Sequence, residues 1–210
     1  MPTGAERILG AVLAGGAGSR VLGADKGLLP LRGRPLVAHA LDALRPQCDS
    51  LLVVANRNPD RYAEFAPTIH DVGAGHAGPL AGLAAAFGFV AANAHADVSW
   101  LATVPVDCPD PPCDLVPRLR VAVNGAVQPG CAYAGVAGQA QPLFALYRIG
   151  GAIDDWLASA RSALERHGSV VRWHVELGAV AIDFDADAAA FHNLNTPDDF
   201  AEYQRAHGGT

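Results

Sequence analysis

The sequence has 210 residues, half of them apolar and 17% charged, which suits a single domain with a substantial core. Its net charge of −6 argues against a nucleic-acid backbone as the main partner. No apolar run reaches the roughly 18 residues of a membrane span, and the N-terminus lacks the basic and hydrophobic segments of a secretion signal. We therefore expect a soluble cytoplasmic protein that binds neither nucleic acid nor membrane.

The cysteines and histidines indicate no metal centre. Four cysteines are present, and none belongs to a Cys-x-x-Cys pair: Cys48, Cys108, Cys113 and Cys131. This spacing suggests neither a zinc site nor a disulfide framework, so we interpret them as reduced thiols with mostly structural roles. The eight histidines are scattered along the chain, and we assign none of them to a metal.

A glycine-rich loop follows the first predicted element, a buried β-strand over 8–13. Gly15, Gly16 and Gly18 allow a left-handed backbone and remove the Cβ atoms that would keep a triphosphate away. Peptide N–H groups in such a loop are free to donate to phosphate oxygens. The loop therefore predicts a phosphate site, with a simple tight turn as the alternative.

Basic side chains are concentrated just after this loop. Four of them lie between positions 20 and 34, against the single acidic Asp25: Arg20, Lys26, Arg32 and Arg34. Arg20 supplies a guanidinium that can bind two phosphate oxygens, and Lys26 supplies a mobile ammonium. Beside the glycines, this charge favours a polyanionic small molecule over a solvated basic face.

The spacing of the loop excludes the two best-known phosphate loops. No Gly-x4-Gly-Lys-Ser/Thr string occurs, and the last glycine of a Gly-x-Gly-x-x-Gly fingerprint is replaced by Val21. The remaining pattern is Leu-Ala-Gly-Gly-x-x-x-Arg followed by Gly-x-Asp-Lys. This pattern resembles the signature of nucleotidyltransferases that join a nucleoside triphosphate to a phosphorylated acceptor and release pyrophosphate.

Helices and strands alternate through the rest of the first half. The pattern predicts a helix over 35–45, a strand over 51–55, an extended segment ending at Asp71, a glycine-rich loop over 73–78 and a helix from Pro79. A strand over 99–104 ends in Pro105-Val106-Asp107. Asp107 therefore lies at the strand end where open α/β sheets bind ligands.

The second half is less regular. We expect a short helix over 113–119, strands over 127–133, 142–147 and 180–184, and a helix over 153–164. A last helix begins at Pro197, with Thr196 as its N-cap and Asp199 as the capping-box partner. The alternation predicts a single-domain α/β protein with three layers and a mostly parallel sheet.

Several motifs together resemble those of the molybdenum cofactor guanylyltransferases, a MobA-like nucleotidyltransferase family. They are the glycine loop, Gly78-Pro79-Leu80-Ala81-Gly82, Pro105-x-Asp107-x-Pro109, Pro142-Leu143 and Asn193-Leu194-Asn195-Thr196-Pro197. The likeness extends from Ile8 to the last helix. It implies a Rossmann-like nucleotidyltransferase fold, GTP and Mg²⁺, and transfer of GMP to molybdopterin to give the guanine dinucleotide cofactor.

The resemblance also implies a set of nucleotide-binding residues: Leu13, Ala14, Gly15, Gly16, Lys26 and Asp71. The loop residues would act through their backbone, and Lys26 would bind the phosphates. For Asp71 the alternative is an ordinary acidic residue at a strand end. The chain has Val54 where some relatives have a nucleotide-contacting asparagine, so base selectivity stays open.

The catalytic set implied by the resemblance is Arg20, Lys26 and Asp107, with Asp107 as the Mg²⁺ ligand. Asn193 and Asn195 match asparagines at the pterin end of the site, although they could merely order the backbone before the last helix. Within the one domain, we expect a nucleotide-binding half at about 8–120 and an acceptor-binding half at about 121–210.

The implied chemistry agrees with these residue types. An acceptor phosphate is already an anionic nucleophile, so the reaction needs alignment of two anions and charge neutralisation rather than a Ser-His-Asp triad. Arg20, Lys26 and Mg²⁺ on Asp107 meet that need, since Mg²⁺ requires only one or two carboxylates beside substrate phosphates. Because a carboxylate at a loop contributes little to the core, we expect Asp107→Ala to abolish transfer and leave the fold intact.

Two alternatives stay open. The first is a related transferase that uses CTP or another phosphorylated acceptor, and the second is a nucleotide-binding module without turnover. The presence of both Lys26 and Asp107 favours an enzyme, because binding alone would not require a carboxylate aimed at the phosphates. The resemblance further implies transient contact with proteins of molybdenum insertion or molybdoenzyme maturation.

Overall fold

The computed structural model describes residues 6–15, 20–21, 24–71, 78–93, 97–125 and 130–207, with the backbone alone at 20, 21 and 24. Within these ranges the central feature is a seven-stranded sheet in the order β11-β9-β10-β8-β1-β6-β7. Its strands are β1 (Arg7–Leu13), β6 (Ser50–Val54), β7 (Thr68–Ile69), β8 (Val98–Pro105), β9 (Cys131–Val136), β10 (Gln139–Arg148) and β11 (Val180–Asp183). The pairings are parallel except for those of β10, which runs antiparallel to β8 and β9. The predicted mostly parallel sheet is confirmed.

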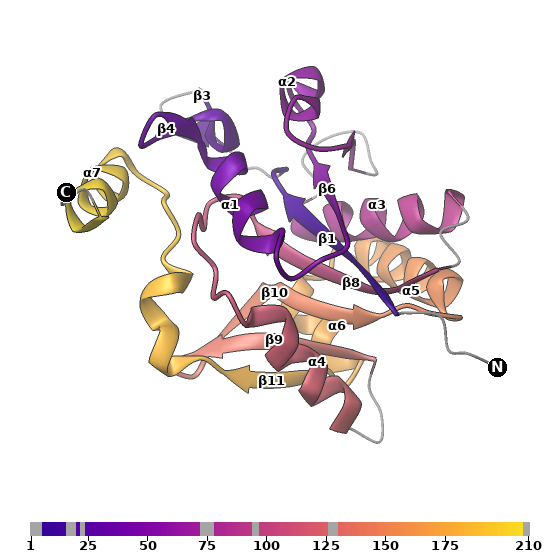
Figure 1. Ribbon diagram of the computed structural model, residues 1–210. Coiled ribbons are helices and arrows are strands. Elements are labelled where there is room, and N and C mark those ends of the chain that lie inside the picture. Colours follow the sequence, from indigo (N-terminus) through magenta and orange to yellow (C-terminus); the bar gives the residue numbers. More distant parts are fainter. Residues whose placement is uncertain are drawn as a thin grey trace.

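Helices cover both faces of the sheet. They are α1 (Leu36–Leu44), α2 (Pro59–Ala63), α3 (Pro79–Ala92), α4 (Leu115–Gly125), α5 (Ile153–Glu165), α6 (Val170–Glu176) and α7 (Pro197–His207), with short 3₁₀ helices η1 (Lys26–Leu28) and η2 (Asp185–Phe191). In Figure 1, α1 and α4 lie in front of the sheet, and α3, α5 and α6 lie behind it. Two apolar clusters fill the two interfaces, which gives the predicted three layers.

The central strands are apolar along their whole length because helices cover them on both sides. In β1, every residue from Ile8 to Leu13 is buried. In β8, only Ser99 is not fully buried. Such continuous apolar runs are typical of parallel strands between two helical layers. These two strands are paired in parallel register, so Leu13 and Pro105 end at the same edge.

The C-terminal helix α7 packs away from the sheet, beside the segment that follows the glycine loop (Figure 1). That segment contains the β2–β3 ribbon (Arg20–Val21 with Ala24–Asp25) and the β4–β5 ribbon (Pro30–Leu31 with Arg34–Pro35). Leu31, Leu36, Leu194 and Tyr203 form a small buried cluster between them. Motifs from the beginning and from the end of the sequence therefore meet on one side of the molecule.

Some predicted elements differ from the observed ones. The helices and strands predicted above leave out the segment between the glycine loop and residue 35, where η1 and the two short strands β4 and β5 lie. Pro35 belongs to β5 and precedes α1. The sequence did not predict α2, α6 or η2, and α4 begins later and runs further than expected. The loop over 72–77 and the start of the strand expected at 127–133 lie outside the described residues.

No helix in the described ranges is both long and apolar enough to cross a membrane. The four cysteines are free thiols, of which Cys108 and Cys131 are buried.

Candidate active site

A cleft of about 650 Å³ opens at the edge of the sheet where β1 and β8 end. Its walls come from the end of β1, η1, the start of α3, the turn after β8, β10, the loop before α6 and the segment before α7. The lining includes Leu13, Ala14, Gly15, Lys26, Gly78, Pro79, Val106, Asp107, Gln141, Pro142, Ser169 and Asn193. Ligands of open α/β sheets bind at this edge, so the cleft is the candidate active site.

Lys26 is the most deeply placed charged group of this cleft. It is only 2% exposed, and its Nζ donates to Asp107 Oδ2 at 2.8 Å and to Asn195 Oδ1 at 2.6 Å. An ammonium with so little access to water needs such partners, because an unpaired buried charge is costly. Lys26 is also the only lysine in the sequence. The structure thus unites three predicted site residues that are up to 169 positions apart.

Asp107 lies in the turn after β8, which is held against β1 by a hydrogen bond from Val106 N to Leu13 O at 3.1 Å. Asp107 Oδ2 accepts the hydrogen bond from the Lys26 ammonium, whereas Asp107 Oδ1 is buried and has no hydrogen-bond partner among the described residues. Such an oxygen fits a divalent cation, because Mg²⁺ prefers oxygen ligands. The described side chains contain no group of three or more His, Cys, Asp or Glu placed to hold a metal. A bound Mg²⁺ would therefore also need substrate phosphates and water.

The asparagines near the C-terminus reach the cleft through a backbone contact. Leu194 is fully buried, and its N–H donates to the carbonyl oxygen of Asp107 at 2.9 Å. Asn195 then contacts Lys26, while Asn193 lines the cleft and has a buried Oδ1 with no partner in the described part of the chain. Of the two asparagines predicted to serve the pterin end, Asn195 thus lies directly beside the lysine predicted to bind phosphates.

The predicted capping box holds Asn195 in place. Asp199 Oδ2 accepts hydrogen bonds from the N–H groups of Asn195 and Thr196, both at 2.7 Å, and Asp199 N donates to Thr196 Oγ1 at 3.2 Å. These backbone donors, first that of Thr196, lower the pKa of the Asp199 carboxyl below its usual range. The cap that begins α7 is confirmed, and it also fixes the backbone of a site residue.

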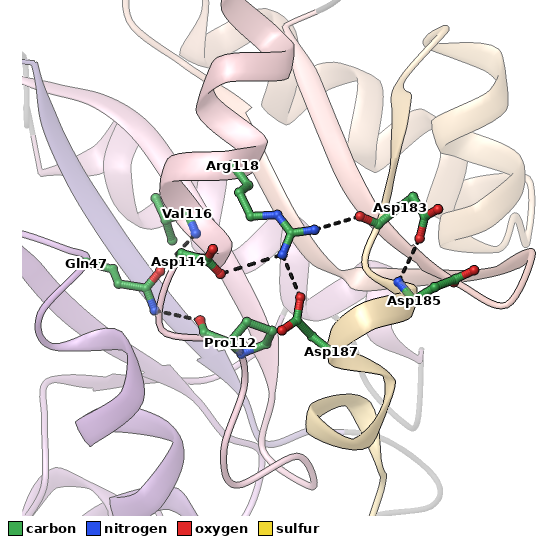
Figure 2. Close-up of polar contacts among 8 residues, drawn as sticks. All are labelled: Gln47, Pro112, Asp114, Val116, Arg118, Asp183, Asp185 and Asp187. Carbon is green, nitrogen blue, oxygen red and sulfur yellow. Dashed lines mark hydrogen bonds and ion pairs between the residues drawn. The ribbon is translucent and has the colours of Figure 1, made fainter.

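The segment leading to these asparagines is anchored by Arg118 on α4 (Figure 2). Its guanidinium donates to Asp187 Oδ2 at 2.6 Å and to the carbonyl oxygen of Asp183 at 2.7 Å. On the other side, Cys108 Sγ donates to the carbonyl oxygen of Ala190 at 2.8 Å. The end of β11 and η2 are thereby attached to α4 and to the turn that carries Asp107.

Gly15 stands against a pair of side chains that follow β6 and β7. Asn56 Oδ1 accepts from Asp71 N at 3.0 Å, and Asn56 Nδ2 donates to Asp71 Oδ2. A Cβ atom at position 15 would lie 3.2 Å from Asn56 Nδ2 and 3.6 Å from Asp71 Oδ2. Any side chain here would press on Asn56, which orients Asp71, so glycine leaves this pair undisturbed beside the cleft.

Two predicted backbone contacts are partly used by the sheet itself. Ala14 N donates to Val54 O at 2.8 Å, and Leu13 O accepts from Val106 N. Ala14 therefore offers a ligand its carbonyl group and not its N–H. Val54, at the position where some relatives have asparagine, is fully buried and packs in the apolar cluster of the α3 face.

Part of the predicted site lies outside the described residues. This applies to Gly16 and Gly18, and to the side chain of Arg20, whose backbone pairs with Asp25 in the β2–β3 ribbon. Their roles in binding and catalysis stay predictions.

The sequence analysis missed two groups that the structure places beside the site. Asn56 directly follows a buried strand, the same signal that identified Asp107, and could have been found in that way. Tyr62 gave no such signal: it is fully buried on α2, and its hydroxyl donates to Asp25 Oδ1 at 2.6 Å. Asn58 Nδ2 donates to the other oxygen, Asp25 Oδ2, at 3.0 Å.

Known proteins resemble the chain in both fold and sequence. The solved structure of molybdopterin-guanine dinucleotide biosynthesis protein A from Archaeoglobus fulgidus superposes with a TM-score of 0.71 over 95% of this chain and 98% of that one, at 21% identity. The molybdenum cofactor guanylyltransferase of Methylibium petroleiphilum is 40% identical over 205 residues, covering 93% of this chain and 95% of its own. The enzyme of the same name from Rhodopseudomonas palustris is 38% identical over 203 residues, covering 92% and 91%.

The fold, the cleft and these relatives define the chain as a nucleotidyltransferase. More narrowly, the model of the MobA-like NTP transferase domain matches residues 10–172, so the chain belongs to that family. The resemblance inferred from the sequence motifs is confirmed.

Proposed function

We propose that the protein transfers GMP from GTP to the phosphate of molybdopterin, giving the guanine dinucleotide cofactor and pyrophosphate. The observation that carries this proposal is the position of Lys26, whose ammonium contacts Asp107 and Asn195 in one cleft at the carboxyl ends of β1 and β8. The curated relatives named molybdenum cofactor guanylyltransferase support it, since they match over nearly the whole chain.

In the proposed reaction, a phosphate oxygen of the acceptor attacks the α-phosphorus of GTP. A new P–O bond forms, the bond from the α-phosphorus to the bridging oxygen breaks, and pyrophosphate leaves with that electron pair. Two polyanions must approach each other, so the protein's task is to align them and to neutralise charge. A magnesium ion held by Asp107 would supply charge neutralisation at the phosphates.

Lys26 has one donor left for this task. A lysine ammonium has three N–H donors, and two of them are directed to Asp107 and Asn195. The third can donate to a phosphate oxygen without loss of the other two contacts. Asp107 and Asn195 thereby orient the ammonium before substrate arrives, which lowers the cost of ordering it in the complex.

Asp71 is the residue that we propose to read the base. Its carboxylate lies beside Gly15 and is oriented by Asn56. A carboxylate only accepts hydrogen bonds, and the pairing edge of guanine offers N–H donors, whereas cytosine has a single amino donor. Asp71→Asn is therefore expected to reduce the preference for GTP over CTP.

The neutral wall of the cleft suits the acceptor. Gln141, Pro142 and Leu143 of β10 line it together with Ser169 and Val170 of the α6 region. A wall of apolar and uncharged polar groups can stack on a flat ring system and hydrogen-bond its edges, as small-molecule sites commonly do. This arrangement supports the division into a nucleotide half and an acceptor half, with Asn195 at their junction.

The decisive experiment is to incubate the protein with molybdopterin, Mg²⁺ and each of the four nucleoside triphosphates, and to measure the dinucleotide product. Product from GTP alone is expected, and Asp107→Asn serves as the inactive control. Product from CTP instead would establish the related cytidylyl transfer. Tight GTP binding with no product from any triphosphate would favour the non-catalytic module.

We further infer that the protein acts in the cytoplasm and meets its acceptor through transient contacts with proteins of molybdenum insertion or molybdoenzyme maturation. This inference follows from the proposed acceptor, an unstable pterin that needs to be handed over directly. Crosslinking in cells, followed by identification of the captured proteins, tests it; capture of no such protein would contradict it.

A further inference from the structure

The Tyr62 side chain holds the residues on both sides of Lys26, although it has no part in the proposed reaction. On the N-terminal side, both carboxylate oxygens of Asp25 are bound, one by the Tyr62 hydroxyl at 2.6 Å and the other by Asn58 Nδ2 at 3.0 Å. On the C-terminal side, a Cβ atom at Gly27 would overlap the Tyr62 hydroxyl and lie 2.9 Å from Val106 Cγ2. The backbone around Lys26 is thus packed between α2 and the turn that carries Asp107.

We propose that Tyr62 is a positioning residue for Lys26, because its hydroxyl fixes the backbone from which the ammonium reaches Asp107 and Asn195. The proposal rests on the proposed function, in which Lys26 binds the phosphates of GTP. Tyr62 comes from a helix 36 positions further along the chain, and it is not among the residues that line the cleft. Its influence on the ammonium would therefore be exerted through the backbone at Asp25 and Gly27.

The geometry indicates a specific role and not merely a filled core. Lysine has a long, flexible stem with many rotamers, so its ammonium is placed accurately only if the stem starts from a fixed backbone. Asn58 supports this arrangement from a left-handed conformation, with φ of 47°, which few residues other than glycine and asparagine adopt readily. Two side chains from one short segment, 58–62, thus converge on the residue that precedes Lys26.

The hydroxyl of Tyr62 is suited to remain a donor. Burial, followed by the hydrogen bond to Asp25, raises the pKa of the phenol well above its usual range. The phenol therefore stays a donor at neutral pH, and the hydrogen bond to the Asp25 carboxylate is charge-assisted.

The first test needs no nucleotide. Because Lys26 is the only lysine, labelling lysine with ¹⁵N at Nζ gives one side-chain signal, which reports this ammonium alone. In Tyr62→Phe, which removes only the hydroxyl, the signal is expected to shift and its protons to exchange with water about tenfold faster or more, as restraint is lost. An unchanged signal and exchange rate in a folded Tyr62→Phe variant would overturn the proposal.

The matched control is Tyr147→Phe. Tyr147 is also fully buried, and its hydroxyl contacts His174 Nε2 at 2.8 Å in the other apolar cluster. The same substitution there removes a comparable hydrogen bond in an apolar cluster that does not contain Tyr62, so the lysine signal should not change. If Tyr62→Phe fails to fold, Asn58→Gly replaces it, since glycine keeps the left-handed backbone and removes the second contact to Asp25.

The second test is a double-mutant cycle on GTP affinity. With Lys26 present, Tyr62→Phe is expected to weaken GTP binding roughly 3- to 30-fold, which lies within the range for residues coupled in one network. In the Lys26→Ala background it should change binding by less than about twofold, because no ammonium remains to be positioned. Equal effects in both backgrounds would mean a general structural role and would overturn the proposal.

The two tests separate this proposal from the proposed function. If Lys26→Ala binds GTP as tightly as the parent protein, the role of Lys26 in nucleotide binding is wrong, and the isotope experiment alone decides whether Tyr62 positions it. If Lys26→Ala loses GTP affinity but Tyr62→Phe affects it equally with and without Lys26, only the positioning role fails.

Discussion

Replacing Asp107 by alanine is expected to destabilise the folded protein as well as to abolish transfer. From the sequence, we expected this change to leave the fold intact, because a carboxylate in a loop contributes little to a core. The structure changes that expectation. Asp107 neutralises an ammonium whose side chain is 3% exposed, at a distance of 2.8 Å, while its own side chain is 22% exposed.

The cost follows from this geometry. Removing one partner of a buried ion pair costs about 3–5 kcal/mol, because the other charge is left without compensation. Here Lys26 keeps one acceptor, Asn195, and water reaches the exposed side of position 107, so we expect a smaller loss of about 2–3 kcal/mol. For a domain of this length, that loss lowers the melting temperature by about 4–12 °C.

The assay is urea and thermal unfolding at pH 7 without Mg²⁺, comparing the parent with Asp107→Ala and with the double variant Lys26→Met/Asp107→Ala. The double variant should regain most of the lost stability, since a buried pair can often be replaced by apolar groups at little cost. A parent and an Asp107→Ala variant with the same unfolding midpoint would refute the reasoning, because the ammonium would then not depend on Asp107.

Three further outcomes are expected. Gly15→Val should weaken GTP binding more than tenfold in a folded protein, because its Cβ would lie 3.2 Å from Asn56 Nδ2 and would disturb the contact of Asn56 with Asp71. Calorimetric titration with GTP measures this. An unchanged affinity would mean that the glycine loop is a simple turn and not a phosphate site. The resemblance placed Asn195 at the pterin end of the site, but its contact with Lys26 leads us to expect that Asn195→Ala also loses GTP affinity, by less than Lys26→Ala does, alongside poorer use of molybdopterin. Separate measurements of GTP affinity and of turnover test this, and an unchanged GTP affinity would contradict it. Burial lowers the pKa of His174 to about 4, so between pH 4 and 6.5 the unfolded chain binds more protons than the folded protein does. The free energy of unfolding should therefore fall with decreasing pH in that window, by up to about 1.4 kcal/mol per pH unit. His174→Asn should flatten this slope, and an equally steep slope in the variant would contradict the assignment.

The parts of the fold that the sequence predicted well are those with a strong local pattern. Buried strands such as β1 and β8 are continuous apolar runs, α3 is apolar along its whole length, and α5 keeps an apolar period over three turns or more. The cap at Thr196 also depends only on neighbouring residues. Local chemistry therefore sufficed for the layers, the direction of the strands and the start of the last helix.

The missed elements are short and lack such a pattern. The helix α2 has five residues, which is too short for a helical period to be seen in the sequence. In α6, Val171 and Val175 are exposed while His174 is fully buried, which reverses the usual relation between polarity and burial. Tertiary packing, not propensity, decides the conformation of such segments.

The site residues likewise divide into those with a local sequence pattern and those placed only by tertiary contacts. Lys26 and Asp107 could be predicted, since each follows a recognisable motif near a strand end. The contact between Lys26 and Asn195 could not, because it joins positions 169 residues apart and depends on the Arg118 anchor and on the burial of Leu194. The role of Asp25 was likewise hidden, since it depends on Tyr62, a residue with no functional signal of its own.

The burial of Lys26 also determines how the protein's surface responds to covalent chemistry. Apart from the eight histidines, all other basic side chains in the sequence are arginines, whose guanidinium groups stay protonated and do not react with acylating reagents at neutral pH. Acetylation, amine-reactive dyes and amine-directed crosslinkers therefore find no exposed lysine side chain on this sequence. Acylation of Lys26 would instead report that its ammonium had lost its contacts to Asp107 and Asn195.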